Sequence, residues 1–267
     1  MTLAIQRFRH ILSKTNVRVP VMWVRHCTLK ADDVFLGSYP RSGSTWLRFI
    51  LQEILTGEPS RFENVNQRIA FIGRHRAAPG LLPNRGRLLQ THEAYRKQYG
   101  RALYLVRDPR DVALSEYAFQ KARGWVDGDF HTYLVSFLRG EVNGFGSWQD
   151  HVRSWLAAGD ASPDSIRVYR YDELRRETFS SLTSMLEFLS VRVSSQKISD
   201  AIASNSLQQM RKKEELSPQK VSKRDRFVRN GSVGGWRENL DDAQIALVNS
   251  YLGRELERLG YNQSSAL

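Results

Sequence analysis

The chain has 267 residues, of which 41% are hydrophobic and 10% aromatic, so it is long and apolar enough to build a sizeable folded core. This composition excludes a disordered chain, and a single cysteine, Cys27, excludes both an intramolecular disulfide and a thiolate metal cluster. The formal net charge of +12 predicts anionic partners such as phosphates, sulfates, acidic glycans, nucleic acid or a membrane surface, although a basic surface can also serve solubility alone.

The first 33 residues form a basic segment with short apolar runs. Ala4, Phe8, Ile11 and Leu12 fall on one face if the segment is helical, and such a helix can pack on the domain or lie on a membrane surface. No apolar run approaches the roughly 20 residues of a membrane-spanning helix, and none has the pattern of a secretory signal. We expect a helical extension over residues 1–33, one domain over residues 34–267 and a cytoplasmic location.

Apolar, β-branched runs alternate with helical patterns along the rest of the chain. Strands are expected over residues 34–38, 87–91, 102–107 and 166–171. Helices are expected over residues 44–55, 109–121, 129–139, 147–158, 174–189 and 241–259. This alternation predicts an α/β fold in which a central parallel sheet is flanked by helices in three layers.

A polar loop follows each of the first three predicted strands. These loops read "SYPRSGST" at 38–45, "THE" at 91–93 and "RDPRD" at 107–111. Since the carboxyl ends of parallel strands meet at one edge of a sheet, we expect the three loops to form a single crevice.

The first loop has the composition of an oxyanion cradle. It brings Arg41, Ser42, Gly43, Ser44 and Thr45 to the start of a predicted helix, where backbone N–H groups and the helix dipole attract an anion. The hydroxyls add donors, and a guanidinium can fork to two oxygens. The Walker A sequence G-x-x-x-x-G-K-[ST] occurs nowhere in the chain, and by itself this loop can also be a simple capped turn.

Three segments in order resemble the motifs of the cytosolic-type sulfotransferases, which use 3′-phosphoadenosine 5′-phosphosulfate (PAPS). "YPRSGSTW" is similar to the 5′-phosphosulfate loop of that family, "LVRDPRDVALSEY" to its second motif and "FVRNGSVGGWRENL" to its third. The resemblance implies that Arg107 and Ser115 grip the 3′-phosphate of the donor. It also implies that Arg229, Asn230 and Gly231 close over the same phosphate.

Further matches lie between these motifs and concern the adenine of the donor. Trp46 stands where the family has an adenine-stacking tryptophan, and "VYRYDEL" resembles a segment whose tyrosine, here Tyr171, contacts adenine. "NSLQQMR" resembles a segment that flanks the purine, which implies contacts from Asn205 and Leu207. The resemblance covers about residues 34–240 and implies the P-loop-like α/β domain of the family, PAPS as sulfuryl donor and no metal.

His92 is the candidate general base among the six histidines of the chain. It follows a predicted strand, and an imidazole titrates near neutrality, which suits base catalysis. "QTHE" also resembles the family segment whose histidine deprotonates the acceptor hydroxyl. Glu93 beside it is left out, since adjacent residues of a strand point apart.

Arg41 is the main departure from the family, which has a lysine at this position. Arginine stays charged and donates hydrogen bonds but is a poor acid, so we expect Arg41 to stabilise the leaving phosphate by electrostatics. Ser44, Asn230 and Gly235 replace threonine, lysine and aspartate of the family, and loss of the lysine is expected to weaken one phosphate contact. The dimer motif of the family is not matched, so the oligomeric state is left open.

Two other readings of the residues remain. One is a nucleotide kinase on a P-loop scaffold with Asp108 or Asp111 holding magnesium, which the absent Walker lysine disfavours. The other is a basic module that binds nucleic acid or an acidic glycan through residues 211–213 and 220–229. No nucleic-acid fold signature accompanies these charges, so we expect no nucleic-acid partner.

The acceptor is not specified by the sequence. Its pocket is expected to include residues 57–83 and 121–133, and the arginines of residues 68–87 indicate either an anionic or polyhydroxylated acceptor or a solvated loop. A small molecule, a sugar, a lipid or a peptide therefore all remain possible acceptors.

Overall fold

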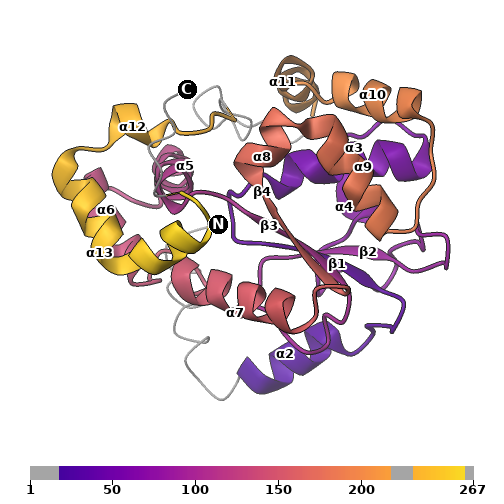
Figure 1. Ribbon diagram of the computed structural model, residues 1–267, viewed down its shortest axis with the longest axis horizontal. Coiled ribbons are helices and arrows are strands. Elements are labelled where there is room, and N and C mark those ends of the chain that lie inside the picture. Colours follow the sequence, from indigo (N-terminus) through magenta and orange to yellow (C-terminus); the bar gives the residue numbers. More distant parts are fainter. Residues whose placement is uncertain (1–17, 218–230, 262–267) are drawn as a thin grey trace.

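The computed structural model describes residues 18–217 and 231–261, with side chains from residue 22 onward (Figure 1). Its strands β1 (Val34–Ser38), β2 (Leu88–Thr91), β3 (Ala102–Val106) and β4 (Ile166–Arg170) pair in parallel in the order β2-β1-β3-β4. All four predicted strands are confirmed to within one residue at each end, and so is the parallel α/β sheet.

Twelve helices surround this sheet in the described residues. They are α2 (Arg18–His26), α3 (Ser44–Thr56), α4 (Val65–Arg68), α5 (Pro109–Ala122), α6 (Phe130–Leu138), α7 (Trp148–Ala161), α8 (Tyr171–Arg176), α9 (Thr178–Phe188), α10 (Ser195–Ser204), α11 (Leu207–Glu215), α12 (Trp236–Asn239) and α13 (Asp242–Arg258). None of the described helices is both long and apolar enough to cross a lipid bilayer.

Most helix predictions are confirmed, but two points differ. The helix expected over residues 174–189 is two helices, α8 and α9, because Glu177 between them has a non-helical backbone (φ −125°, ψ 54°). Helices α4, α10, α11 and α12 were not predicted. Of these, α11 carries only Leu207 and Met210 as apolar residues, which is too few for a clear helical pattern. The predicted helix around Ala4 lies outside the described residues, and the proposed boundary at residue 33 stays a prediction.

The sheet is buried on both faces, as its apolar strands require. Successive residues of β1 point to opposite sides: Phe35 packs in the core that includes α7, whereas Leu36 packs in the core that includes α3 and α9. Figure 1 shows α7 on one side of the strands and α3, α8 and α9 on the other. Helices on both faces leave the strand ends and their loops free to form a site.

Trp155 of α7 fixes the distance between its helix and the sheet. Its ring stacks on Tyr104 of β3, with centroids 4.9 Å apart and planes 6° apart, and its Nε1 donates to the carbonyl of Glu93 (3.0 Å). It also crosses β1 at Gly37, where an added Cβ would lie only 2.5 Å from the indole. The indole therefore holds together β1, β3 and the loop that follows β2.

We predict that Gly37→Ala destabilises the fold by about 1–3 kcal/mol, because the methyl group must displace a fully buried tryptophan. Urea unfolding followed by circular dichroism measures this change. Gly100→Ala is the matched control, since an added Cβ there meets nothing within 4 Å. Equal unfolding midpoints for the two variants would contradict the account of this contact.

Candidate active site

A cavity of about 900 Å³ opens where the loops after β1, β2 and β3 converge. The crevice predicted from these loops is therefore present. Eleven of the predicted site residues line it: Arg41, Gly43, Ser44, Thr45, Trp46, His92, Arg107, Ser115, Tyr171, Leu207 and Gly231. Ser42 and Asn205 lie behind the lining, and Arg229 and Asn230 lie outside the described residues.

The loop after β1 makes a tight turn into the N-terminus of α3, at the cavity. Arg41 (φ 67°) and Gly43 (φ 95°) both have left-handed backbones. Gly43 is the N-cap residue of α3, and no side-chain hydrogen bond caps the helix there. A Cβ on Gly43 would lie 2.4 Å from the Tyr171 ring, so a side chain has no room there. The buried Ser42 hydroxyl has no hydrogen-bond partner among the described residues. This loop fits an oxyanion at a helix N-terminus.

Arg41 and Ser115, assigned from separate motifs, touch each other. The Arg41 Nε donates to the Ser115 hydroxyl (3.2 Å), and the guanidinium lies over the Phe119 ring, 4.6 Å from its centre. Helix α5 thereby orients Arg41 along the cavity wall.

Arg107 joins the loop after β1 to the segment that resembles the third motif. Its Nη1 donates to the carbonyl of Arg41 (3.0 Å), and its Nη2 donates to the carbonyl of Ser232 (2.8 Å). The Tyr171 hydroxyl adds a bond to the carbonyl of Gly231 (3.1 Å). Residues far apart in the sequence thus meet around one guanidinium at the cavity.

Asp108 and Asp111, the carboxylates that a kinase would use for magnesium, are engaged within the protein. Asp108 caps α5 and pairs with Arg110 (2.7 Å), while Asp111 accepts from the amides of Gly234 (2.9 Å) and Trp236 (3.0 Å). No group of three or more His, Cys, Asp or Glu side chains within residues 18–217 and 231–261 is arranged to hold a metal ion. Asp111 instead fastens the segment before α12 to α5.

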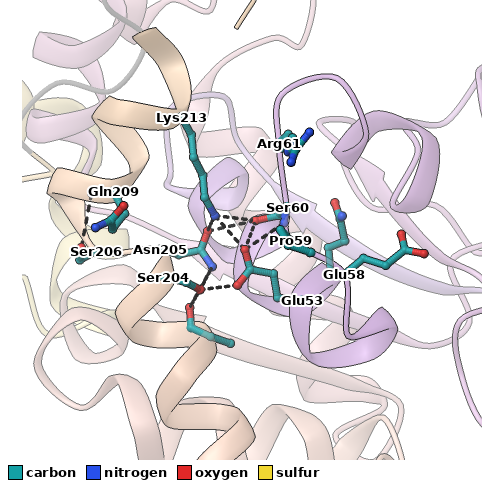
Figure 2. Close-up of polar contacts among 12 residues, drawn as sticks. Glu53, Glu58, Pro59, Ser60, Arg61, Ser204, Asn205, Ser206, Gln209 and Lys213 are labelled. Carbon is teal, nitrogen blue, oxygen red and sulfur yellow. Dashed lines mark hydrogen bonds and ion pairs between the residues drawn. The ribbon is translucent and has the colours of Figure 1, made fainter. Parts of the chain in front are cut away.

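Figure 2 shows a polar network around Asn205, and the backbone carbonyl of this residue supports Trp46. The Trp46 Nε1 donates to the Asn205 carbonyl (2.8 Å), and the Asn205 side chain accepts from Lys213 (2.8 Å). Lys213 also pairs with Glu53 (2.8 Å), which accepts from Ser60 (2.6 Å). Asn205 therefore supports Trp46 and does not line the cavity, and its contact with the purine stays a prediction.

Arg175 is a cavity residue that the sequence reasoning missed. Its guanidinium lies over the Trp46 ring, 5.0 Å from the centre, one helical turn after Tyr171 in α8. Arg175 comes four residues after Tyr171, the predicted adenine contact, and this spacing could have predicted that both lie on one face of a helix.

His92 presents one ring nitrogen to the cavity. Its Nδ1 donates to the carbonyl of Ser38 (2.8 Å), which leaves Nε2 as the unprotonated acceptor of the neutral ring. Burial lowers the pKa of His92 to about 4, with the hydrogen bond to Ser38 opposing and the charges of Arg48 and Arg41 adding to the shift. The imidazole is therefore neutral near pH 7.

Glu93 points away from His92, as expected for its neighbour. It accepts from Tyr99 (2.9 Å) and Arg96 (2.9 Å) and pairs with His26 (3.1 Å) and Arg25 (3.0 Å) of α2. Burial acts to raise the pKa of Glu93, but the hydrogen bond and charge of His26 and the charge of Arg25 lower it to about 2. This carboxylate anchors α2 and takes no part in the cavity.

Aromatic side chains line much of the cavity, and two of them, Phe71 and Phe145, lie beside His92. Both predicted acceptor segments contribute, with Phe71 from the first and Trp125 and Phe130 from the second, but residues 143–145 were not foreseen. The arginines of residues 68–87 do not line the cavity, so they give no support to an anionic acceptor.

Glu116 is a buried carboxyl among the residues that line the cavity. Its Oε1 accepts from Gln120 (2.9 Å), and its Oε2 has no partner among the described residues. Burial raises the pKa of Glu116 against the opposing charge of Arg41. Glu116 follows Ser115 in the motif, and its charge was the only feature of the sequence that could have indicated a role in the cavity.

Comparison with known proteins gives a consistent match. The family described as "Sulfotransferase domain" matches residues 31–260. Mouse Sulfotransferase 2A2 is 28% identical over 235 residues, which is 81% of both chains. Mouse Sulfotransferase 2B1 is 28% identical over 241 residues, which is 83% of this chain and 70% of the relative.

Solved structures with a similar fold include mouse sulfotransferase SULT7A1 complexed with PAP. It has a TM-score of 0.67 and 23% identity, and the match covers 91% of this chain and 93% of that one. Retinol dehydratase in complex with androsterone and the inactive cofactor PAP has a TM-score of 0.67 and 17% identity, over 92% of this chain and 84% of that one. These similarities establish the fold.

We predict that Lys213→Met destabilises the protein by about 1–3 kcal/mol, because it leaves the Glu53 carboxylate and the Asn205 oxygen without their cation. Chemical denaturation measures the loss. Lys212→Met is the matched control, since Lys212 is the exposed neighbour on α11. If both variants unfold alike, the network of Figure 2 contributes no stability.

Proposed function

Because the chain belongs to the sulfotransferase family, we propose that it transfers the sulfuryl group of PAPS to an acceptor hydroxyl or amine by in-line displacement. The observation that carries the proposal is the meeting of an anion-binding loop, Arg41 and the neutral His92 on one cavity. Neighbouring structures that contain PAP, the desulfated donor, support the choice of donor.

The donor is proposed to bind along the loop after β1 and the start of α3. Backbone amides at Gly43 and Ser44, with the unpartnered Ser42 hydroxyl, suit the 5′-phosphate. Arg107 and Ser115 suit the 3′-phosphate, and Arg229, Asn230 and Gly231 stay predictions for the same group. The donor supplies an activated sulfonate whose leaving group is an already acidic phosphate.

The adenine is proposed to lie against Trp46. The indole is fixed by Asn205 on one edge and faces Tyr171 at a steep angle of 81°. Leu207 also lines the cavity and is proposed to lie beside the purine.

His92 is proposed to take the proton of the acceptor. Its Nδ1 is already bound to the Ser38 carbonyl, so only Nε2 is available as a base, and the ring orientation is fixed. Phe71 and Phe145 pack near the ring, with centroids 5.5 and 5.7 Å away, and help to exclude water.

Arg41 is proposed to stabilise the charge that develops on the leaving phosphate. Its contact with Ser115 and its stacking on Phe119 hold the guanidinium at the cavity wall. A fixed cation in a partly dry site gives strong electrostatic stabilisation without donating a proton.

The acceptor is proposed to be a molecule with an apolar body. Aromatic side chains surround the space beside His92, and related structures hold androsterone and retinol. A lipid or a small molecule fits this lining better than a strongly anionic glycan, while sugar and peptide acceptors need an apolar portion.

We predict that His92→Ala lowers sulfuryl transfer by at least about a hundredfold and leaves PAP binding within twofold, because only the base is lost. Arg41→Ala should lower kcat by about a hundredfold, and Arg41→Lys should restore part of it. Radiolabelled donor with an acceptor panel measures transfer, and calorimetry with PAP measures binding. Full turnover by Arg41→Ala would contradict the role of Arg41.

The same assay tests the alternative hypothesis that the protein is a nucleotide kinase. Transfer that persists in EDTA supports sulfuryl transfer, whereas strict dependence on magnesium and ATP would contradict it. A preference for a nucleic-acid ligand over PAP would instead support the polyanion-binding module.

We predict that kcat/KM stays flat from pH 7 to about pH 5 and falls as the pH drops through about 4. The base must be unprotonated, and the lowered pKa of His92 delays its protonation relative to a free histidine, which would lose activity near pH 6.5. PAP binding followed over the same range is the control for unfolding. A fall centred near pH 6.5 would contradict this assignment.

A further inference from the structure

Helix α2 is fastened to the domain by its last turn. Arg25 pairs with Glu93 (3.0 Å) and donates to the carbonyl of Ile72 (3.2 Å), and His26 meets Tyr99 (3.0 Å) and the same carboxylate. These bonds hold the helix at the lower edge of the molecule in Figure 1. The surface that α2 presents to solvent is therefore fixed relative to the domain.

Two apolar side chains stand on that surface just before the anchored turn. Trp23 is 71% exposed and its neighbour Val24 is 52% exposed. A tryptophan gains from a site where its ring leaves water while its N–H stays near polar groups. Neither residue lines the catalytic cavity.

All the charged side chains in the sequence around this helix are basic. The first 31 residues contain no Asp or Glu and include six cations: Arg7, Arg9, Lys14, Arg18, Arg25 and Lys30. The first acidic residues, Asp32 and Asp33, follow this stretch, and Asp33 is buried against Arg87 (2.5 Å).

A neighbouring loop adds further exposed cations. The Arg76 Nη2 lies 3.4 Å from the Cys27 sulfur, and a Cβ on Gly73 would lie 3.3 Å from the Arg25 side chain, so residues 73–76 run alongside the end of α2. Arg74 and Arg76 are both exposed. We call Trp23, Val24, Lys30, Arg74 and Arg76 the α2 surface.

We propose that the α2 surface docks on an anionic lipid bilayer, with Trp23 and Val24 in the headgroup region and the cations against lipid phosphates. Each cation near an anionic leaflet strengthens binding by about fivefold, and a buried tryptophan ring adds an apolar contribution. A soluble polyanion would use the cations alone, so the exposed apolar pair favours lipid. The proposal is independent of sulfuryl transfer.

The test is sedimentation of the full chain with phosphatidylcholine vesicles, with and without phosphatidylglycerol. We expect binding to the anionic vesicles at least about tenfold tighter than to the neutral ones, and weaker at high salt. Trp23→Ser should weaken anionic binding by about tenfold, whereas Trp23→Phe should retain most of it. Arg74→Ser/Arg76→Ser should weaken it by at least about tenfold and flatten its salt dependence.

Matched controls remove the same number of cations or exposed aromatics elsewhere on the surface. Arg192→Ser/Lys212→Ser removes two exposed cations next to α10 and on α11, at the opposite edge of the molecule in Figure 1, and should bind as the parent does. Phe179→Ser removes another exposed aromatic, on α9, with the same expectation. Thermal melting verifies that each variant is folded.

Three results would overturn the proposal. They are equal binding to neutral and anionic vesicles, no binding to either, and anionic binding that both charge pairs weaken alike. Binding of heparin that Trp23→Ser leaves unchanged, together with no vesicle binding, would identify the α2 surface as a polyanion site.

Discussion

The site depends on one guanidinium that ties three distant segments together. Arg107 stands at the end of β3 and donates to the carbonyl of Arg41 in the first loop and to that of Ser232 in the third segment. Both bonds go to backbone, so they set the positions of chain segments and not of single side chains. Because β3 is a central strand of a sheet buried on both faces, the clamp has a rigid base.

Local sequence rules determined most of this architecture. Continuous apolar runs identify strands that are buried on both faces, and the parallel sheet then brings the polar loops of β1, β2 and β3 to one edge. Arg41 and Ser115 were each found by motif, but their mutual hydrogen bond arises because the loop after β1 and the helix after β3 follow neighbouring strands of the sheet. Contacts of this kind have no signature in either segment.

The roles that could not be predicted from the sequence belong to buried polar residues. Glu116 looks like an ordinary charged helix position until α6 and the loop after it cover it, and Arg48 looks like a surface arginine although it is buried and donates to the carbonyl of Val65 (3.1 Å). Asn205 was expected beside the purine, and its backbone carbonyl supports Trp46. Tertiary packing decides such roles, so neither spacing nor charge could assign them.

The sharing of Glu93 between α2 and the strand end that carries His92 has a practical consequence for protein engineering. A chain cut to begin at residue 31, where the family match starts, would lose Arg25 and His26, which both pair with this carboxylate. The carboxylate would keep Arg96 and Tyr99 but would sit one residue from the proposed base with fewer counter-ions. Minimal versions of the enzyme should therefore retain α2, even though this helix lies outside the family match.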